Sequence, residues 1–255
     1  MLEWLCALTE RSFTARTSIV STQKRQVVAG NTTIRTYSSD EHLVRQRRSH
    51  IAACAVKLFA RKGFKATTMR ELAKACGMAP GALYHYFGTK DDVLHIIVSS
   101  AATGGGLLKD YVRRLGSPSA TEALAACIRE YYRWADTDQE NYLFFNREML
   151  SFTHEDRLSL LKSQVDIMGV FEELLLQGTE KGEFKCDYPL VMAHNIVVQG
   201  FDWAMRRWYF KNRVTLQEYT DIEIELLFRQ LGADPARVGT RPPVGTPAVA
   251  TAGHS

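Results

Sequence analysis

Two short helical segments joined by a glycine turn constrain this chain more than any other feature. The first segment, residues 68 to 76, opens with Thr68, a hydroxyl residue that can cap a helix, and its apolar residues recur at three- and four-residue spacing. Gly77 ends this segment, and Pro80 suits the first turn of the next helix. Only about three residues separate the two helices, which predicts the steep crossing of a helix-turn-helix.

The second segment has an anchoring face and a reaching face. Leu83 and Phe87 lie four residues apart and predict the buried side. Small side chains at Gly81 and Ala82 would bring the backbone close to base edges, and the Tyr84 hydroxyl could meet a phosphate. From this segment we expect DNA contacts by Gly81, Ala82, Tyr84, His85 and Tyr86.

The residues before the turn supply cations and hydroxyl groups. A first helix is predicted over residues 41 to 62, with its basic side chains mostly off the apolar face, where they could touch a phosphate backbone. A hydroxyl pair opens the second helix, and an arginine in its first turn could reach a base or a phosphate. The added contacts are Arg45, Arg48, Thr67, Thr68 and Arg70.

The distribution of charge supports the same interpretation. Residues 43 to 98 carry ten Lys and Arg against three Asp and Glu, a net charge of +7, whereas residues 1 to 42 carry +1 and residues 99 to 255 carry −4. Positive charge that coincides with a helix-turn-helix is expected for a segment that binds phosphate. The pattern therefore predicts double-stranded DNA as a partner.

The motif also resembles a known family. Extended to Gly-Phe-Lys-Ala-Thr-Thr at 63 to 68 and Gly-Thr-Lys-Asp-Asp at 88 to 92, it is similar to the N-terminal domain of the TetR family of transcriptional regulators over residues 45 to 98. The resemblance implies an all-helical homodimer that binds operator DNA and is released by a small ligand in its C-terminal domain. Lys90 matches a lysine of that family and would hold a phosphate.

Two alanines depart from the family pattern. Ala79 and Ala82 stand where the family often has Ser or Thr, so a cap or phosphate contact and a possible base contact are lost. Ala79 is kept among the expected DNA contacts, but the operator sequence cannot be inferred from relatives. A helical oligomeric ligand-binding or scaffold protein without specific DNA binding is the alternative that these alanines leave open.

The rest of the chain predicts an all-α fold with two domains. A helix starting at Lys90 would join the domains and weaken or end at 103 to 106, because three glycines stand there. The last two helical segments have heptad-like spacing and resemble the family's dimer interface. Five segments follow Pro118, over 121 to 135, 139 to 152, 155 to 179, 189 to 211 and 216 to 231. The expected divisions are a disordered extension at 1 to 40, a three-helix DNA-binding domain at 41 to 98, a larger ligand-binding and dimerisation domain at 99 to 233, and a disordered tail at 234 to 255.

The N-terminal extension has several interpretations. It is rich in Ser, Thr and Arg and lacks periodicity, which predicts disorder. We favour a passive tail or a start codon assigned too far upstream; a phosphate-binding arm and a transit peptide are the alternatives.

The sequence lacks the motifs typical of enzymes and the long apolar runs typical of membrane proteins. The sequence has no Gly-x-Ser-x-Gly, no His-Glu-x-x-His and no dinucleotide glycine fingerprint, so no catalysis, metal or cofactor is expected. No apolar run approaches the roughly 18 residues of a membrane span, so a cytoplasmic protein is expected. Five cysteines without a Cys-x-x-Cys pair are interpreted as reduced thiols, with a redox sensor as the minor alternative.

The C-terminal segments are rich in aromatic residues, which suits a largely apolar ligand pocket with a few polar groups. The spacing from His194 to Trp208 looks similar to family members that respond to acyl-coenzyme A thioesters; an apolar acid or a drug-like aromatic compound would suit the same residues. The predicted ligand contacts are Tyr142, Phe145, Asn146, Met149, Met168, His194, Gln199, Trp203, Arg206 and Arg207.

Overall fold

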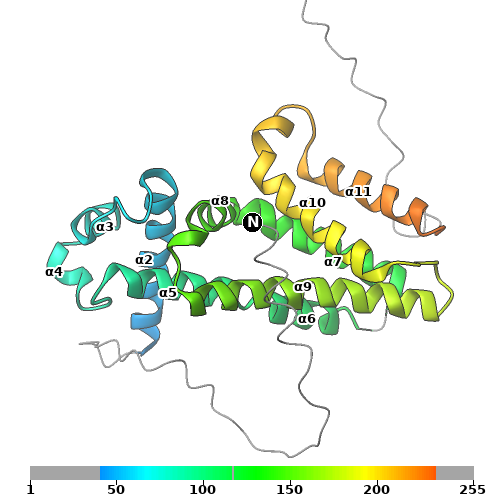
Figure 1. The fold of residues 1–255 in the computed structure, drawn as a ribbon, viewed down its shortest axis with the longest axis horizontal. Helices are drawn as coiled ribbons and strands as arrows, with labels where there is room; N and C mark the ends of the chain where they lie inside the picture. The colour runs from blue at the N-terminus through cyan, green and yellow to red at the C-terminus, as the bar shows by residue number, and fades with distance from the viewer. Residues whose placement is uncertain (1–40, 117, 234–255) are drawn as a thin grey trace, which may run out of the picture. The chain divides into compact units, whose positions relative to one another are not determined.

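The computed structural model describes residues 41–116 and 118–233, and all regular elements in this part of the chain are helical (Figure 1). The all-α prediction is therefore confirmed. The expectations for residues 1 to 40 and 234 to 255 lie outside the described residues. In chain order the elements are α2 (Glu41–Lys62), α3 (Met69–Ala75), α4 (Pro80–Leu83), α5 (Lys90–Ala101), α6 (Gly104–Arg114), α7 (Ala120–Thr137), α8 (Gln139–Glu148), the 3-10 turn η1 (Met149–Ser151), α9 (His154–Glu180), α10 (Pro189–Phe210) and α11 (Leu216–Gln230).

Helices α2 to α5 enclose the first hydrophobic core. Fully buried Ile51 and Phe59 of α2 face Leu72 of α3 and Leu83 of α4, and the ring of Phe64 meets that of Phe59 edge-on at 5.2 Å between centroids. Aromatic pairs prefer this arrangement to a face-to-face stack. The predicted three-helix unit is thus built around α2.

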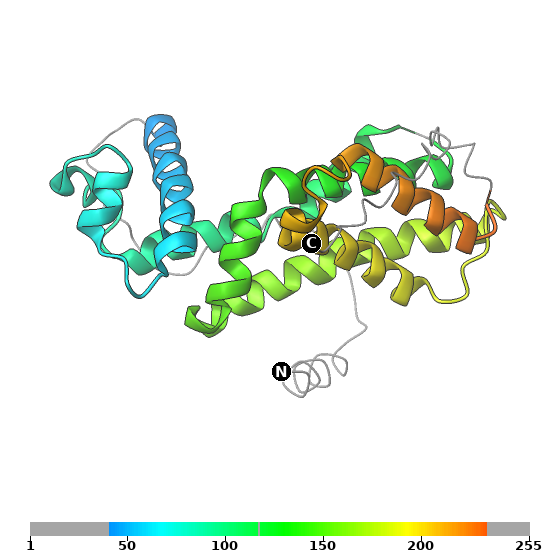
Figure 2. The same cartoon turned by 90° about the horizontal axis from the view of Figure 1, so that it is seen from above.

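Helix α9 is the central element of the second core. It packs against α6, α7 and α10, while α11 packs on α7 (Figure 1). Tyr131, Phe171 and Phe228 are fully buried in this core. Seen from above, α10 and α11 lie on the same face of the molecule (Figure 2).

Helix α8 contributes to the first core and also contacts a helix of the second. It packs against α2 on one side and α10 on the other. Its Phe144 is fully buried in the first core, 5.7 Å from the Phe59 ring, and Phe152 after η1 and Leu160 of α9 join the same cluster. The first core therefore extends past residue 98, where the sequence placed a domain boundary.

The sequence predicted most elements closely but gave no separate helix between residues 104 and 116. Glycines disfavour a helix, and α6 begins with three of them. Tertiary packing explains their use, because a Cβ on Gly105 would collide with Asp166 of α9. Gly105 lets α6 approach α9 closely, and this contact offsets the poor helix propensity of the glycines. Within the described residues no helix is both long and apolar enough to cross a membrane.

Candidate nucleic-acid interface

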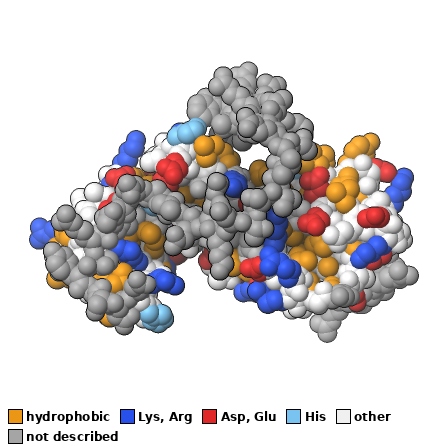
Figure 3. All heavy atoms as spheres, turned by 90° about the horizontal axis from the view of Figure 1, so that it is seen from below, with side chains coloured by type: hydrophobic (Ala, Val, Ile, Leu, Met, Phe, Trp, Pro, Cys, Tyr) orange, Lys and Arg blue, Asp and Glu red, His pale blue; other side chains and the backbone are white. Residues whose placement is uncertain are grey.

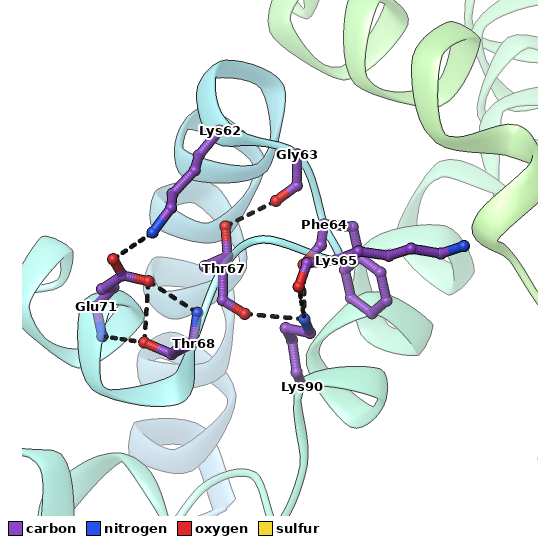
Figure 4. A network of polar contacts seen from close by, with 8 residues as sticks. All are labelled: Lys62, Gly63, Phe64, Lys65, Thr67, Thr68, Glu71 and Lys90. Carbon is purple, nitrogen blue, oxygen red and sulfur yellow. Dashed lines mark hydrogen bonds and ion pairs between the residues drawn. The ribbon is translucent and has the colours of Figure 1, made fainter.

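A capping box fixes the start of α3. The Glu71 backbone N–H donates to Thr68 Oγ1 at 3.3 Å, and the Thr68 backbone N–H donates to Glu71 Oε2 at 3.0 Å (Figure 4). The Lys62 ammonium pairs with the same carboxylate. This ion pair, followed by the hydrogen bonds from Thr68, lowers the pKa of Glu71 to about 2. The end of α2 and the start of α3 are thereby held together.

The turn after α3 has the geometry predicted from Gly77. This glycine has a φ of 66°, in the left-handed region that favours glycine. Its N–H donates to Lys74 O at 3.1 Å, and the Met78 N–H donates to Ala73 O at 2.9 Å. This pair of bonds is the Schellman motif, and it sets the direction in which the chain leaves α3.

The reader segment, residues 80 to 87, combines buried anchors with an outward surface. Helix α4 ends formally at Leu83, and the backbone bonds of Tyr86 and Phe87 to Leu83 O extend the turns. Leu83 and Phe87 are fully buried, whereas Tyr84 is 54% exposed. Gly81 and His85 are also exposed. The predicted burial of Leu83 and Phe87 and exposure of Gly81, Tyr84 and His85 are therefore observed, whereas Tyr86 packs against the first core.

Lys90 has partners that differ from the predicted phosphate. Its Nζ donates to Phe64 O at 2.6 Å, to Thr67 O at 2.8 Å and to Lys65 O at 3.3 Å, and it lies 4.4 Å from the centroid of the Phe64 ring (Figure 4). An ammonium group has three donors, and all three are used here. In this structure Lys90 holds the α2–α3 loop against the start of α5.

Thr67 requires a correction. The sequence placed it among the DNA contacts, but it is only 2% exposed, and its hydroxyl donates to Gly63 O at 2.8 Å. A polar group in this loop is buried because a backbone carbonyl satisfies it. Thr67 therefore supports the loop and does not reach the surface.

The predicted cations differ in exposure. Arg45 and Arg70 are exposed. Arg48 is half-buried, with its guanidinium 5.9 Å from the centroid of the Phe87 ring, and its buried Nε and Nη2 have no hydrogen-bond partner among the described residues. Ala79 is exposed, and Ala82 and Tyr86 are half-buried. Of the predicted arginines, Arg45 and Arg70 are therefore exposed and Arg48 is not.

Helices α2 to α5 form the reader unit. Sequence analysis did not identify the side chains that connect this unit to the C-terminal helices. His95 Nδ1 of α5 lies 2.9 Å from Oδ1 of Asp156, a buried residue near the start of α9. Arg147 of α8 donates to Ala60 O of α2 at 3.0 Å. The Thr-x-x-Glu spacing of the α3 capping box could have been found in the sequence. His95 and Arg147 contact residues far away in the sequence, and no local sequence pattern predicts such contacts.

The predicted ligand contacts do not gather in one cavity. Phe145 and Met149 pack against the first core, and Trp203 is 4% exposed, with its Nε1 donating to Asp136 Oδ1 at 2.9 Å. His194 and Gln199 were expected on a buried helix face but are exposed. They were misplaced because α10 buries only the side that meets α7 and α9, and periodicity does not identify that side.

The other predicted ligand contacts are also dispersed. Asn146, Arg206 and Arg207 are exposed, and Arg206 and Arg207 pair with Asp202 and Asp136. Tyr142 is half-buried, with its ring 5.8 Å from that of Phe201. Met168 packs against the second core.

An open groove lies between α10 and α11. It has a volume of about 370 Å³, with a floor from α7 and walls from the two later helices. Burial raises the pKa of Glu223 in its wall. Gln199 is the one predicted ligand residue in its lining. The lining residues are Ile128, Tyr132, Met192, Asn195, Ile196, Val198, Gln199, Glu223, Leu226, Leu227 and Gln230.

The capped α3, the glycine turn and the exposed reader segment define a helix-turn-helix DNA-binding protein. The family model described as bacterial regulatory proteins, tetR family, matches residues 51–97, and the tetracyclin repressor-like C-terminal domain matches residues 117–231. The chain belongs to the TetR family of transcriptional regulators, and its relatives are regulators rather than enzymes.

Individual relatives agree with this assignment. The transcriptional regulator HbdR of Aromatoleum sp. (strain CIB) is 24% identical over 76% of this chain and 84% of its own length. The repressor KstR2 of Rhodococcus jostii (strain RHA1) is 26% identical over 64% of this chain and 79% of its own. The crystal structure of AibR in complex with isovaleryl coenzyme A and operator DNA is 23% identical, covers 71% of this chain and 98% of that one, and has a TM-score of 0.59, which shows a shared fold.

Proposed function

We propose that this regulator represses transcription as a homodimer on a palindromic operator and is released by a bulky apolar or acyl-coenzyme A-type ligand. One observation carries the DNA-binding part: Leu83 and Phe87 are fully buried while Tyr84 between them is 54% exposed. The buried face of the reader segment therefore anchors it in the first core, while Tyr84 on the opposite face remains accessible. Such a segment suits the major groove.

The exposed face of α10 and α11 supports a dimer. Leu190, Val191 and Val198 of α10 are 41% to 63% exposed, and Ile222 and Leu226 of α11 are 47% and 50% exposed. Apolar side chains gathered on one face mark an interaction site. A second copy would cover this face and the groove beside it. Two reader segments about 34–36 Å apart could then read a palindrome.

Helix α8 supplies a route from a ligand to DNA. Tyr142 on one side of α8 meets Phe201 of α10, and it neighbours the buried Tyr131 of α7, whose hydroxyl donates to Val197 O at 3.3 Å. Phe144 on the other side lies in the first core. A ligand that entered beside Tyr142 would displace α8, and α2 with its reader unit would follow. Because packed cores shift between discrete arrangements, a small displacement could change the spacing of two reader segments.

The ligand class rests on chemistry and on relatives. Tyr142, Phe201 and Met168 offer apolar surface near the second core, which suits a hydrophobic ligand. AibR was crystallised in complex with isovaleryl coenzyme A, and a second structural neighbour is the ketosteroid transcriptional regulator KstR2 of Mycobacterium tuberculosis. Both relatives are compatible with a bulky apolar effector. Binding to chromosomal DNA would place the protein in the cytoplasm, as the sequence predicted.

DNA binding is tested by footprinting the full chain on the intergenic DNA upstream of its own gene, with nonspecific competitor. We expect a protected palindrome. Arg45→Ala and Arg70→Ala should each weaken binding and reduce the slope of log affinity against log salt by about 1, because each removes one phosphate contact. The control is Lys185→Ala, an exposed cation outside the reader unit. Equal affinity and slope in all four proteins would exclude these arginines from the DNA interface.

The ligand is tested separately. The footprinted complex is titrated with acyl-coenzyme A thioesters of increasing chain length and with the matching free acids. Release by a thioester, weakened in Tyr142→Ala, supports the proposal. Binding of none of them to the free protein would remove this ligand class and leave repression standing.

A further inference from the structure

The cysteines of the described chain have different surroundings. Cys127 is fully buried in the second core, and Cys186 is buried in the same core. Cys54 on α2 is half-buried and remains a free thiol, as does the buried Cys76 at the end of α3. Of these four thiols, Cys54 alone combines access to solvent with a second thiol beside it.

Cys54 lies between an imidazole and a thiol. Its Sγ is 3.7 Å from Nε2 of His50, one turn earlier on α2. On the other side it neighbours the Cys76 thiol, in the first core where α3 packs on α2. Burial, and then the neighbouring Cys54, raises the pKa of Cys76 to about 12. Cys76 is therefore the shielded thiol and the less suited to attack an oxidant first, whereas Cys54 is half-buried and has a proton acceptor at hand.

We propose that Cys54 and Cys76 form a dithiol that a hydroperoxide oxidises to a disulfide. The placement assigns Cys54 to the attacking role and Cys76 to the resolving role. His50 is a positioning residue that can take the Cys54 proton. A small peroxide suits the site because Cys54 is half-buried and a larger oxidant would have less access to the sulfur.

The reaction balances with the hydroperoxide as the only co-reactant. The Cys54 proton passes to His50, and the thiolate attacks the outer oxygen of the O–O bond. An S–O bond forms, the O–O bond breaks, and the leaving alkoxide takes the proton from His50 to give an alcohol. The Cys76 sulfur then attacks the Cys54 sulfur, and the sulfenic hydroxyl leaves with the Cys76 proton as water. Two thiols are oxidised by two electrons, and the peroxide is reduced to alcohol and water.

The bond would act on the turn that positions the reader segment. Cys76 closes α3, with its N–H donating to Leu72 O at 3.0 Å, and it directly precedes the Gly77 turn. A disulfide requires the two Cβ atoms to lie about 3.8 Å apart, in place of the longer spacing of two thiols in contact. Its formation would draw this turn toward α2. A loss of operator affinity is expected. This consequence rests on the proposed function, whereas formation of the disulfide does not depend on it.

The chemistry is tested on the full chain with Cys6→Ser, so that only the four described thiols remain. After hydrogen peroxide and alkylation, peptide mapping should show a Cys54–Cys76 crosslink and the loss of two free thiols. Adding Cys76→Ser should stop oxidation at a Cys54 sulfenic acid that dimedone traps. Adding Cys54→Ser should prevent thiol loss, and Cys186→Ser should behave as the parent. Absence of the crosslink, or thiol loss in the Cys54→Ser chain at the parent's rate, overturns the proposal.

The consequence is tested on the footprinted DNA. Oxidised parent protein should bind about tenfold more weakly, a typical coupling between sites, and dithiothreitol should restore affinity. The Cys54→Ser chain should bind equally before and after peroxide. A crosslinked protein with unchanged affinity would overturn the regulatory effect. Failure of the reduced protein to bind DNA would count against the proposed function, while the peptide map still decides the chemistry.

Discussion

Polar side chains around the reader segment mostly hold backbone in place. Lys90 donates to three carbonyl oxygens of the α2–α3 loop, and Thr67 donates to a fourth at Gly63. Loop carbonyls that are shielded from water must find donors. These residues position the surface that we propose to meet DNA, and Tyr84, Arg45 and Arg70 are exposed there.

Lys90→Met should destabilise the protein by about 2 kcal/mol, because charged donors to the loop carbonyls are lost. Urea unfolding followed by circular dichroism measures the change. Lys65→Met is the control, since Lys65 is an exposed lysine of the same loop and its loss should cost less than about 0.5 kcal/mol. If Lys90→Met left stability unchanged but weakened DNA binding, Lys90 would act on phosphate, as its sequence context suggested.

Residue-level prediction from sequence succeeded where the partner is near in the chain. Gly77 was identified from the end of a periodic segment, and Thr89 with Asp92 from their spacing, and both caps are present. The partners of Lys90 lie 23 to 26 residues away. No local pattern specifies such a contact, which explains why a phosphate was expected there.

At the scale of elements, capping boxes recur at helix starts. Thr68 with Glu71, Thr89 with Asp92, Ser119 with Glu122 and Thr215 with Glu218 each pair a hydroxyl with a carboxylate three residues later. Each box satisfies backbone donors that a helix start leaves unpaired. Among these four boxes, only that of α3 has a lysine from the preceding helix on its capping carboxylate. Its start should therefore depend on pH in acid.

Glu71→Gln should flatten the dependence of thermal stability on pH in acid. An unfolded glutamate titrates near about 4.3, whereas the pKa of folded Glu71 is held at about 2. The carboxylate thus stabilises the fold fully above about pH 4.3, and this contribution is lost as pH falls toward 2. Melting temperatures between about pH 5 and 2.5 should fall less steeply in the variant. Glu180→Gln, an exposed residue at the end of α9, is the control and should follow the parent.

Helix α8 shows how packing crosses a sequence boundary. Phe144 and Phe145 were expected in the ligand-binding domain, but they cover α2 in the first core. Periodicity gave the position of α8 and its apolar face. It could not say which neighbour that face meets, because both cores are apolar.

Phe144→Ala should destabilise the protein by about 3–5 kcal/mol, since a fully buried ring leaves a cavity beside Phe59. Leu143→Ala is the matched control, because Leu143 is adjacent on α8 and 38% exposed. Urea unfolding should show a small change for the control. Similar losses in the two variants would mean that α8 is not part of the reader unit's core.

At the scale of the whole molecule, exposed apolar side chains occur on two faces. One is the face of α10 and α11 with its groove. The face seen from below also shows hydrophobic side chains between charges of both signs (Figure 3). The groove of the first face, at about 370 Å³, exceeds the hollow of about 200 Å³ between α6 and α9. A groove lined by both apolar and polar side chains can receive side chains of a second copy.

Leu226→Lys should lower the fraction of dimer measured by sedimentation velocity. The added ammonium would be buried in the proposed interface. Removing it from water is costly even with the Glu223 carboxylate in the same groove. Leu176→Lys is the control, since Leu176 is 52% exposed on α9 and Leu226 is 50% exposed on α11. Equal dimer fractions in both variants and the parent would place the interface elsewhere.

The aromatic contact between α8 and α2 bears on how this regulator could be re-engineered. A chimera that transplants residues 41 to 98 onto a foreign sensor would expose Phe59 and leave behind Phe144, Phe152 and Leu160, which complete its core. The transplantable cassette ends instead beyond Leu160, inside α9. A chimera that exchanges DNA specificity between such proteins would therefore have to include part of the ligand-binding domain together with the DNA-binding helices.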